Sequence, residues 1–209
     1  MKQAGTFVIP DTDTYFAPFL EEGGFQLDRL KLALSFVEEF DTAVDGGAHV
    51  GSWTREMAKV FFTVFAIEPA EDTYQCLLKN IEGIDNIVEL NVALGATSGR
   101  GKIVDDVSRH GNTGSRFMQI DNEGRIDLIT LDSLELANLD FLKLDVEGFE
   151  YYALKGGEQT ITHFKPTILV EEKGFGRRYD LQPFAASRLL ESWGARCVAN
   201  RGKDYVFVF

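Results

Sequence analysis

The chain has 209 residues, of which 44% are hydrophobic and 12% aromatic, enough for one well-buried core but short for two full domains. Its 33 acidic and 21 basic side chains give a formal net charge of −12, which disfavours a nucleic-acid partner because such a chain repels phosphates on average. The two distant cysteines argue against a zinc site and against a disulfide scaffold. Without a long apolar run or a signal-peptide pattern, we expect a cytoplasmic protein with no membrane partner.

Residues 1–41 precede the first predicted strand. Within them, Leu30, Leu34 and Val37 recur at helical spacing, which predicts a helix. No motif in this segment points to a substrate. We therefore expect a single domain over 1–209 that begins with a helical N-terminal extension over 1–41.

From residue 42 onward, short β-rich runs alternate with segments of helical period. Strands are predicted at 42–47, 63–69, 86–94, 139–148, 166–173, 195–200 and 204–209, and helices at 52–61, 71–83 and 181–193. This alternation predicts an α/β fold, an open parallel sheet with helices on both faces. The last two strands, joined by the turn NRGK, indicate an antiparallel edge, and the glycine-rich region 95–130 predicts an insertion of loops and short strands.

The stretch AVDGGAHVGSW, residues 43–53, ends the first strand in an acid and three glycines. Ligands of open α/β sheets bind beyond the carboxyl ends of the strands, and glycines let the backbone approach them closely. The G-x-G-x-x-G spacing of dinucleotide sites is broken here, and the carboxylate of Asp45 would repel a diphosphate. An acid suits S-adenosylmethionine better, because that cofactor carries a sulfonium and an ammonium group and no phosphate.

The second strand ends in AIEP, which places Glu68 at the same predicted edge. A carboxylate there can accept hydrogen bonds from both hydroxyls of a ribose. The alternative is an exposed acid at a strand end, with Pro69 as the first residue of the next helix. Asp45, the glycines and Glu68 together favour a cofactor that contains a nucleoside.

Five segments, VDGGAHVGSWT, FAIEP, LNVALG, TLDSL and DFLKLDVEGFEYYALKGG, resemble the motifs of the FkbM-like family of S-adenosylmethionine-dependent methyltransferases. The resemblance runs from about residue 42 to residue 173, and LDVEG is its most specific element. It implies a Rossmann-like, seven-stranded class I methyltransferase sheet with an antiparallel last strand. It also implies O-methylation, often of sugar or polyketide-type hydroxyls, so we expect a small-molecule or carbohydrate acceptor.

The same resemblance implies a cofactor site. It places Asp45, Gly47 and Gly51 at the methionine part of the cofactor and Glu68 at the ribose. Adenine would lie near Asn91, Val92 and Ala93, although NVAL can equally be a plain strand end. Further cofactor contacts are expected from neighbouring motif positions, namely Gly46, Ala48, Ser52, Pro69 and Asp145.

The segment KLDVEGFE puts Lys143, Asp145 and Glu147 on one face if the strand extends that far. Buried charges are costly unless they are paired or serve a site. We therefore expect Asp145 and Glu147 to orient the acceptor or remove its proton. The structural alternative is an internal ion pair of Lys143 with Asp145 or a neighbour.

Two further candidates for this chemistry lie outside that segment. Glu171 and Glu172 end the adjacent strand, one of them should face the same cleft, and we favour Glu172. His110, in the glycine-rich insertion, is another candidate base, with a plain surface histidine as the alternative. Three converging carboxylates could instead hold Mg²⁺, but the D…D-N pattern of catechol-type methyltransferases is lacking and no metal is expected.

The sequence thus predicts an S-adenosylmethionine-dependent methyltransferase acting on an oxygen. A non-catalytic module that binds the same cofactor is one alternative, although Asp145 and Glu147 argue against such a loss of function. An NAD(P)-dependent oxidoreductase is a weaker one, because we find neither its glycine fingerprint nor a proton donor in context.

Overall fold

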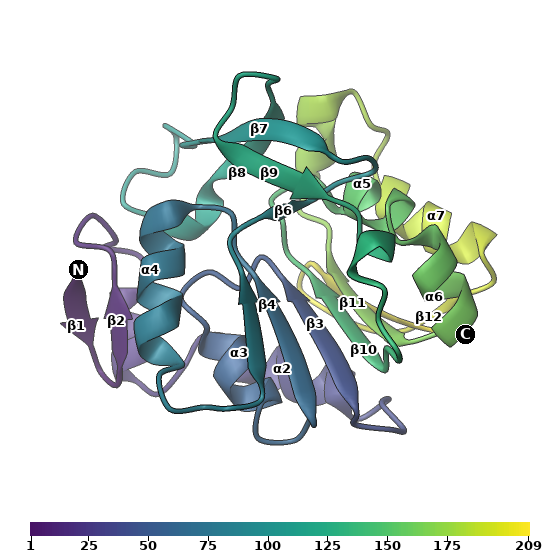
Figure 1. The fold of residues 1–209 in the computed structure, drawn as a ribbon, viewed down its shortest axis with the longest axis horizontal. Coiled ribbons are helices and arrows are strands. Elements are labelled where there is room, and N and C mark those ends of the chain that lie inside the picture. The colour runs from purple at the N-terminus through teal and green to yellow at the C-terminus, as the bar shows by residue number, and fades with distance from the viewer.

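A seven-stranded sheet forms the centre of the protein in the computed structural model, which describes residues 1–209 (Figure 1). Its strands are β3 (Thr42–Gly46), β4 (Thr63–Ile67), β5 (Ile87–Leu90), β10 (Phe141–Leu144), β11 (Thr167–Glu171), β12 (Arg196–Arg201) and β13 (Asp204–Val208), in the order β12-β13-β11-β10-β3-β4-β5. Strand β13 runs antiparallel to both of its neighbours, and the pairs from β11 to β5 are parallel. The predicted α/β class and the antiparallel last strand are confirmed.

Helices cover both faces of this sheet (Figure 1). On one face lie α2 (Leu27–Leu34), α3 (Ser52–Met57) and α4 (Glu71–Asn80), which bury Leu30, Met57 and Leu77 against one apolar cluster. On the other face lie α5 (Glu150–Lys155), α6 (Glu158–Phe164) and α7 (Ala185–Ser192), whose Leu154 and Leu190 belong to a second cluster. Because successive strand side chains point to opposite faces, one strand feeds both clusters.

The N-terminal extension is only partly helical. It begins with an antiparallel hairpin of β1 (Lys2–Ala4) and β2 (Phe7–Ile9), and then continues through the short helix α1 (Ala17–Glu21) into α2. Asn80 at the end of α4 holds the hairpin, since its side chain accepts from Val8 N at 2.6 Å and donates to Val8 O at 2.8 Å. The expectation of a purely helical extension missed this hairpin because its two strands are too short to show a period.

The insertion forms a second sheet above the carboxyl ends of the central strands (Figure 1). Its strands are β6 (Ala93–Leu94), β7 (Gly99–Val104), β8 (Phe117–Ile120) and β9 (Ile126–Ile129), in the order β6-β9-β7-β8. The strand predicted at 86–94 is therefore split at 91–92 between the two sheets. Three 3₁₀ turns lie in the loops: Thr113–Ser115 between β7 and β8, Asp132–Leu134 between β9 and β10, and Phe175–Tyr179 between β11 and α7. None of the helices has the length and apolar character needed to span a bilayer.

Candidate functional site

One cavity opens beyond the carboxyl ends of β3, β4 and β10, under the second sheet. The loops that follow these strands form its floor, and the N-terminal segment and the insertion contribute Phe16 and Thr113 to its walls. The predicted cofactor residues that line it are Gly46, Gly47, Ala48, Ser52, Glu68, Pro69, Val92, Ala93 and Asp145. The structure thus brings together nine of the twelve, from segments far apart in the chain.

Asp45 does not line this cavity. It is fully buried beneath the loop, with Oδ1 at 2.9 Å from Lys143 Nζ and Oδ2 accepting from Thr54 Oγ1 at 2.7 Å. Lys143 also donates to Gly47 O at 2.6 Å. The argument that Asp45 would repel a diphosphate was therefore wrong, because Lys143 neutralises its charge. The alternative, an internal ion pair of Lys143 with a neighbour, is the arrangement observed.

Gly51 and Asn91 do not line the cavity but support the segments around it. Gly51 is the N-cap residue of α3 with φ +85°, and a Cβ there would lie 2.6 Å from Leu77, so this glycine permits helix packing rather than ligand approach. Asn91 donates its side-chain amide to Glu68 O at 2.9 Å and to Pro69 O at 3.2 Å. It therefore holds the loop that carries Glu68.

Glu68 is a buried acid whose carboxylate is held by three donors. Oε2 accepts from His49 N at 2.8 Å, and Oε1 accepts from Ala70 N at 3.0 Å and from Thr73 Oγ1 at 2.8 Å. Burial raises the pKa of this carboxyl, while the same hydrogen bonds oppose the rise. The result is a rigidly oriented acid in the cavity wall, at the end of β4 where the sequence predicts a ribose partner.

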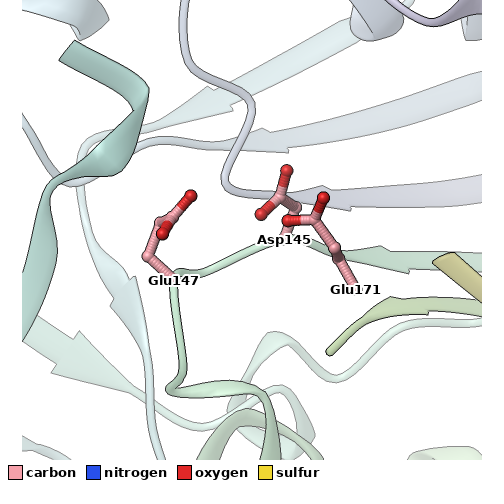
Figure 2. Close-up of side chains that lie close together, drawn as sticks. All are labelled: Asp145, Glu147 and Glu171. Atoms are coloured by element: carbon pink, nitrogen blue, oxygen red, sulfur yellow. The ribbon is translucent and has the colours of Figure 1, made fainter. Parts of the chain in front are cut away.

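A cluster of three acids lies where β10 and β11 end: Asp145, Glu147 and Glu171 offer oxygens within 4.8 Å of one another (Figure 2). The parallel register pairs Leu144 with Val170, so the next residues, Asp145 and Glu171, are adjacent. Lys173 contacts all three carboxylates, at 3.7 Å from Asp145, 2.9 Å from Glu147 and closest to Glu171. Asp145 and Glu147 also line the cavity, so the cluster faces the ligand space.

Glu147 lies in a turn after β10, so strand alternation does not explain its place in the cluster. Strand β10 ends at Leu144, and Glu147 adopts φ +55°, a strained conformation for a residue other than glycine. Glu150 supports this turn by accepting from Val146 N at 3.1 Å and Gly148 N at 3.0 Å. Only 5% of Glu147 is exposed and its Oε2 has no hydrogen-bond donor. Strain and a buried oxygen that lacks a hydrogen-bond donor are together typical of functional positions.

The preference for Glu172 over Glu171 was wrong. Successive residues of a strand point to opposite faces, and Glu172 turns away from the cluster towards the start of α7. There its carboxylate accepts from Ala186 N and Ser187 N, both at 3.2 Å, and from the hydroxyl of Ser187. Glu172 therefore stabilises the beginning of a helix, and Glu171 is the acid that faces the cleft.

His110 lies outside the cavity as well, on an exposed polar groove with Arg109 and Thr14, so its surface alternative describes its position. The histidine in the cavity wall is His49, whose Nε2 lies 2.7 Å from Thr113 Oγ1. Thr113 in turn donates to the fully buried Asp13 through both N and Oγ1. This chain joins the loop after β3 to the insertion and to the N-terminal segment. Burial lowers the pKa of His49 to about 4, so it is neutral at pH 7.

Sequence reasoning did not assign site roles to Lys173, His49 or Thr113. A signal existed for His49, which lies inside the glycine loop, and for Lys173, which follows the two acids at the end of the strand. Thr113 carried none, because it comes from the insertion, whose position depends on the tertiary fold.

Comparison with known proteins agrees with this architecture. The family model for the methyltransferase FkbM domain matches residues 45–197 of the sequence. No curated protein matches the chain in sequence. A crystal structure of methyltransferase FkbM from Methylobacillus flagellatus is similar, with TM-score 0.58 and 19% identity over 92% of this chain, which spans 50% of the length of that protein.

Two further solved structures share the fold over almost their whole length. Precorrin 8w decarboxylase from Methanobacterium thermoautotrophicum has TM-score 0.55 and 14% identity, with complete coverage of both chains. Precorrin-6y C5,15-methyltransferase from Geobacter metallireducens has TM-score 0.53 and 12% identity, covering 99% of this chain and 96% of its own. The fold is thus the Rossmann-like class I methyltransferase fold, and by the family match over most of its length the chain belongs to the FkbM methyltransferase domain family.

Proposed function

We propose that this protein transfers a methyl group from S-adenosylmethionine to a hydroxyl oxygen of a small molecule or carbohydrate. The observation that supports this most is the distribution of acids in one cavity. A fully hydrogen-bonded glutamate, Glu68, lies at the end of β4, and an acid cluster in which some buried oxygens lack hydrogen-bond donors lies at the ends of β10 and β11. A methyltransferase needs one place to hold a nucleoside and another to handle a proton.

The cavity residues fit the proposed cofactor. Apolar side chains of Ile67, Val92 and Leu94 line the cavity beside Glu68, which suits an adenosine whose ring is apolar on its faces and whose ribose donates hydrogen bonds. In this proposal Glu68 would hold the ribose, and the loop 46–49 would hold the methionine part. When bound, the cofactor supplies an electrophilic methyl group on a sulfonium.

Asp145 and Glu147 would handle the acceptor. A hydroxyl becomes a better nucleophile as it loses its proton, so a carboxylate within hydrogen-bond reach accelerates transfer. Glu147 Oε2 is a buried oxygen without a hydrogen-bond donor, and burial together with the charge of Asp145 raises the pKa of this carboxyl, so Glu147 is the better proton acceptor. For Asp145 burial is outweighed by the charge of Lys173 and by its other neighbours, which hold the pKa well below its ordinary value and suit Asp145 to orienting the acceptor. With the methyl group supplied by the bound cofactor, the carboxylate would take up the hydroxyl proton of the acceptor as that oxygen is methylated. Most of the rate would come from holding the acceptor in line.

Calorimetric titration with S-adenosylmethionine, S-adenosylhomocysteine and NAD tests the cofactor, followed by a labelled-methyl assay over hydroxylated acceptors. We expect the first two ligands to bind and Glu68→Ala to weaken them. Glu71→Ala, which removes an exposed acid at the start of α4, is the matched control and should bind normally. Binding of NAD alone would contradict the proposal. Cofactor binding with no transfer to any acceptor would instead favour a non-catalytic module.

A further inference from the structure

The acid cluster already contains a cation. The ammonium group of Lys173 lies 2.9 Å from Glu147 Oε1, 3.7 Å from Asp145 Oδ1 and closest to Glu171 Oε2. These are the three carboxylates whose convergence would otherwise suit a divalent ion (Figure 2). An ammonium group offers three donors, so one lysine can bind one oxygen of each acid.

Charge balance in the cluster is consistent with this arrangement. Burial, and the charge of neighbouring Asp145, raise the pKa of Glu171 to about 10, so Glu171 retains its proton at pH 7. The remaining carboxylates, Asp145 and Glu147, face two cations, Lys173 and Arg109, the latter at 3.7 Å from Glu147 Oε2. A buried group of charges is tolerated when it is paired in this way, and a further divalent cation would leave it with excess positive charge.

We propose that Lys173 is a positioning residue that serves as the built-in cation of this site. It holds Asp145 and Glu147 against the cavity, as a divalent metal does in sites made of carboxylates, so the protein needs no divalent metal there. The lysine follows β11 directly, and the backbone beside it is fixed because Glu172 N donates to Lys203 O at 2.9 Å. This inference rests on the proposed function for its role in methyl transfer, but the occupancy of the cluster is testable without an acceptor.

The experiment titrates Mn²⁺ into the purified protein, with detection by calorimetry and by the electron paramagnetic resonance signal of free Mn²⁺. We expect wild type to bind no Mn²⁺ at the cluster, so its Mn²⁺ uptake should equal that of Glu171→Gln. Lys173→Met keeps the aliphatic part of the side chain but lacks the charge. It should bind Mn²⁺ at least about tenfold more tightly than wild type does, or by about 1.4 kcal/mol. Lys173→Arg restores a cation and should abolish that gain, and Lys173→Met combined with Glu171→Gln should lose it too.

Two results would overturn the proposal. One is a wild-type Mn²⁺ site that is lost in Glu171→Gln, because the cluster would then be a metal site from which the lysine moves aside. The other is a folded Lys173→Met variant that binds no more Mn²⁺ than wild type. Should Lys173→Met fail to fold, the comparison of wild type with Glu171→Gln decides alone: uptake lost in that variant overturns the proposal, and its absence supports it. S-adenosylhomocysteine binding, measured on the same wild-type sample, separates this inference from the proposed function.

Discussion

Glu68 and Glu147 are both buried glutamates in the wall of one cavity, yet their carboxylates have opposite surroundings. Glu68 accepts hydrogen bonds from two backbone amides and a threonine hydroxyl. Glu147 lies on a strained turn, next to two other acids, and one of its oxygens has no donor. A fully satisfied acid is fixed in place and suits binding, whereas an incompletely satisfied one can still take up a proton.

Asp45 is a third buried acid and shows a different role. Its partners, Lys143 and Thr54, are buried with it and it does not reach the cavity. Burial of a carboxylate near a cofactor loop is therefore not sufficient evidence of a binding role. What distinguishes the three acids is which partners they have and whether they reach the cavity.

The largest expected effect is on methyl transfer at the cluster. Asp145→Asn and Glu147→Gln keep the size of each side chain but remove its basicity. With an acceptor identified by the screen, we expect each to lower the rate of transfer by about 10²- to 10⁴-fold at saturating cofactor. Single-turnover assays measure this, and circular dichroism controls for folding. Unchanged rates in both variants would remove these acids from the chemistry.

Next in size is the stability of the buried Asp45–Lys143 pair. Lys143→Met leaves Asp45 as an unpaired buried charge, so we expect a loss of about 3–5 kcal/mol in the free energy of unfolding. The double variant Asp45→Asn/Lys143→Met should recover a large part of that loss, because no charge then remains unpaired. Urea denaturation of the four proteins checks this, and a double variant as unstable as Lys143→Met would contradict a structural role for the pair.

His49 predicts a pH dependence of stability. Its folded pKa is about 4 and its unfolded value is 6.5, so the unfolded chain takes up a proton as the pH falls through 6.5 while the folded protein does not. The stability due to the neutral histidine is complete above pH 6.5 and is lost progressively down to pH 4, by roughly 3 kcal/mol.

His49→Asn isolates this contribution, because asparagine tolerates the φ of +53° at this position. The difference in unfolding free energy between wild type and this variant should shrink between pH 7.5 and pH 4.5. A difference that is independent of pH would mean that His49 does not titrate in the predicted range.

The smallest expected effect concerns Glu172. Because its carboxylate accepts backbone amides at the start of α7, Glu172→Ala should lower the free energy of unfolding by about 1 kcal/mol. Affinity for S-adenosylhomocysteine should stay within the error of the titration. Thermal unfolding and calorimetry report the two effects separately, and a loss of affinity would return Glu172 to the site.

The sequence predicts the central sheet well and the site in part. Each core strand is a short apolar run ended by glycine or an acid, so β3, β4, β10 and β11 are visible without a structure. The second sheet is not, because β7 reads GRGKIV and has neither a clear period nor an apolar run. The N-terminal hairpin is too short to predict.

At the site, sequence reasoning found the residues of the cofactor loop but not their partners. Strand alternation shows that only one of Glu171 and Glu172 can face the cleft, yet the choice between them depends on the register of β11 against β10. The pairing of Asp45 with Lys143 likewise depends on β3 and β10 being neighbours in the sheet. Such contacts between distant segments are set by topology, and local pattern does not reveal them.

The most direct test of the division between binding and chemistry compares two variants in one titration series. Affinity for S-adenosylhomocysteine is measured for wild type, Glu68→Ala and the double variant Asp145→Asn/Glu147→Gln. We predict that Glu68→Ala weakens binding at least about tenfold, or about 1.4 kcal/mol, and that the double variant stays within about threefold of wild type. The opposite order, with binding lost in the cluster variant and kept in Glu68→Ala, would contradict the account.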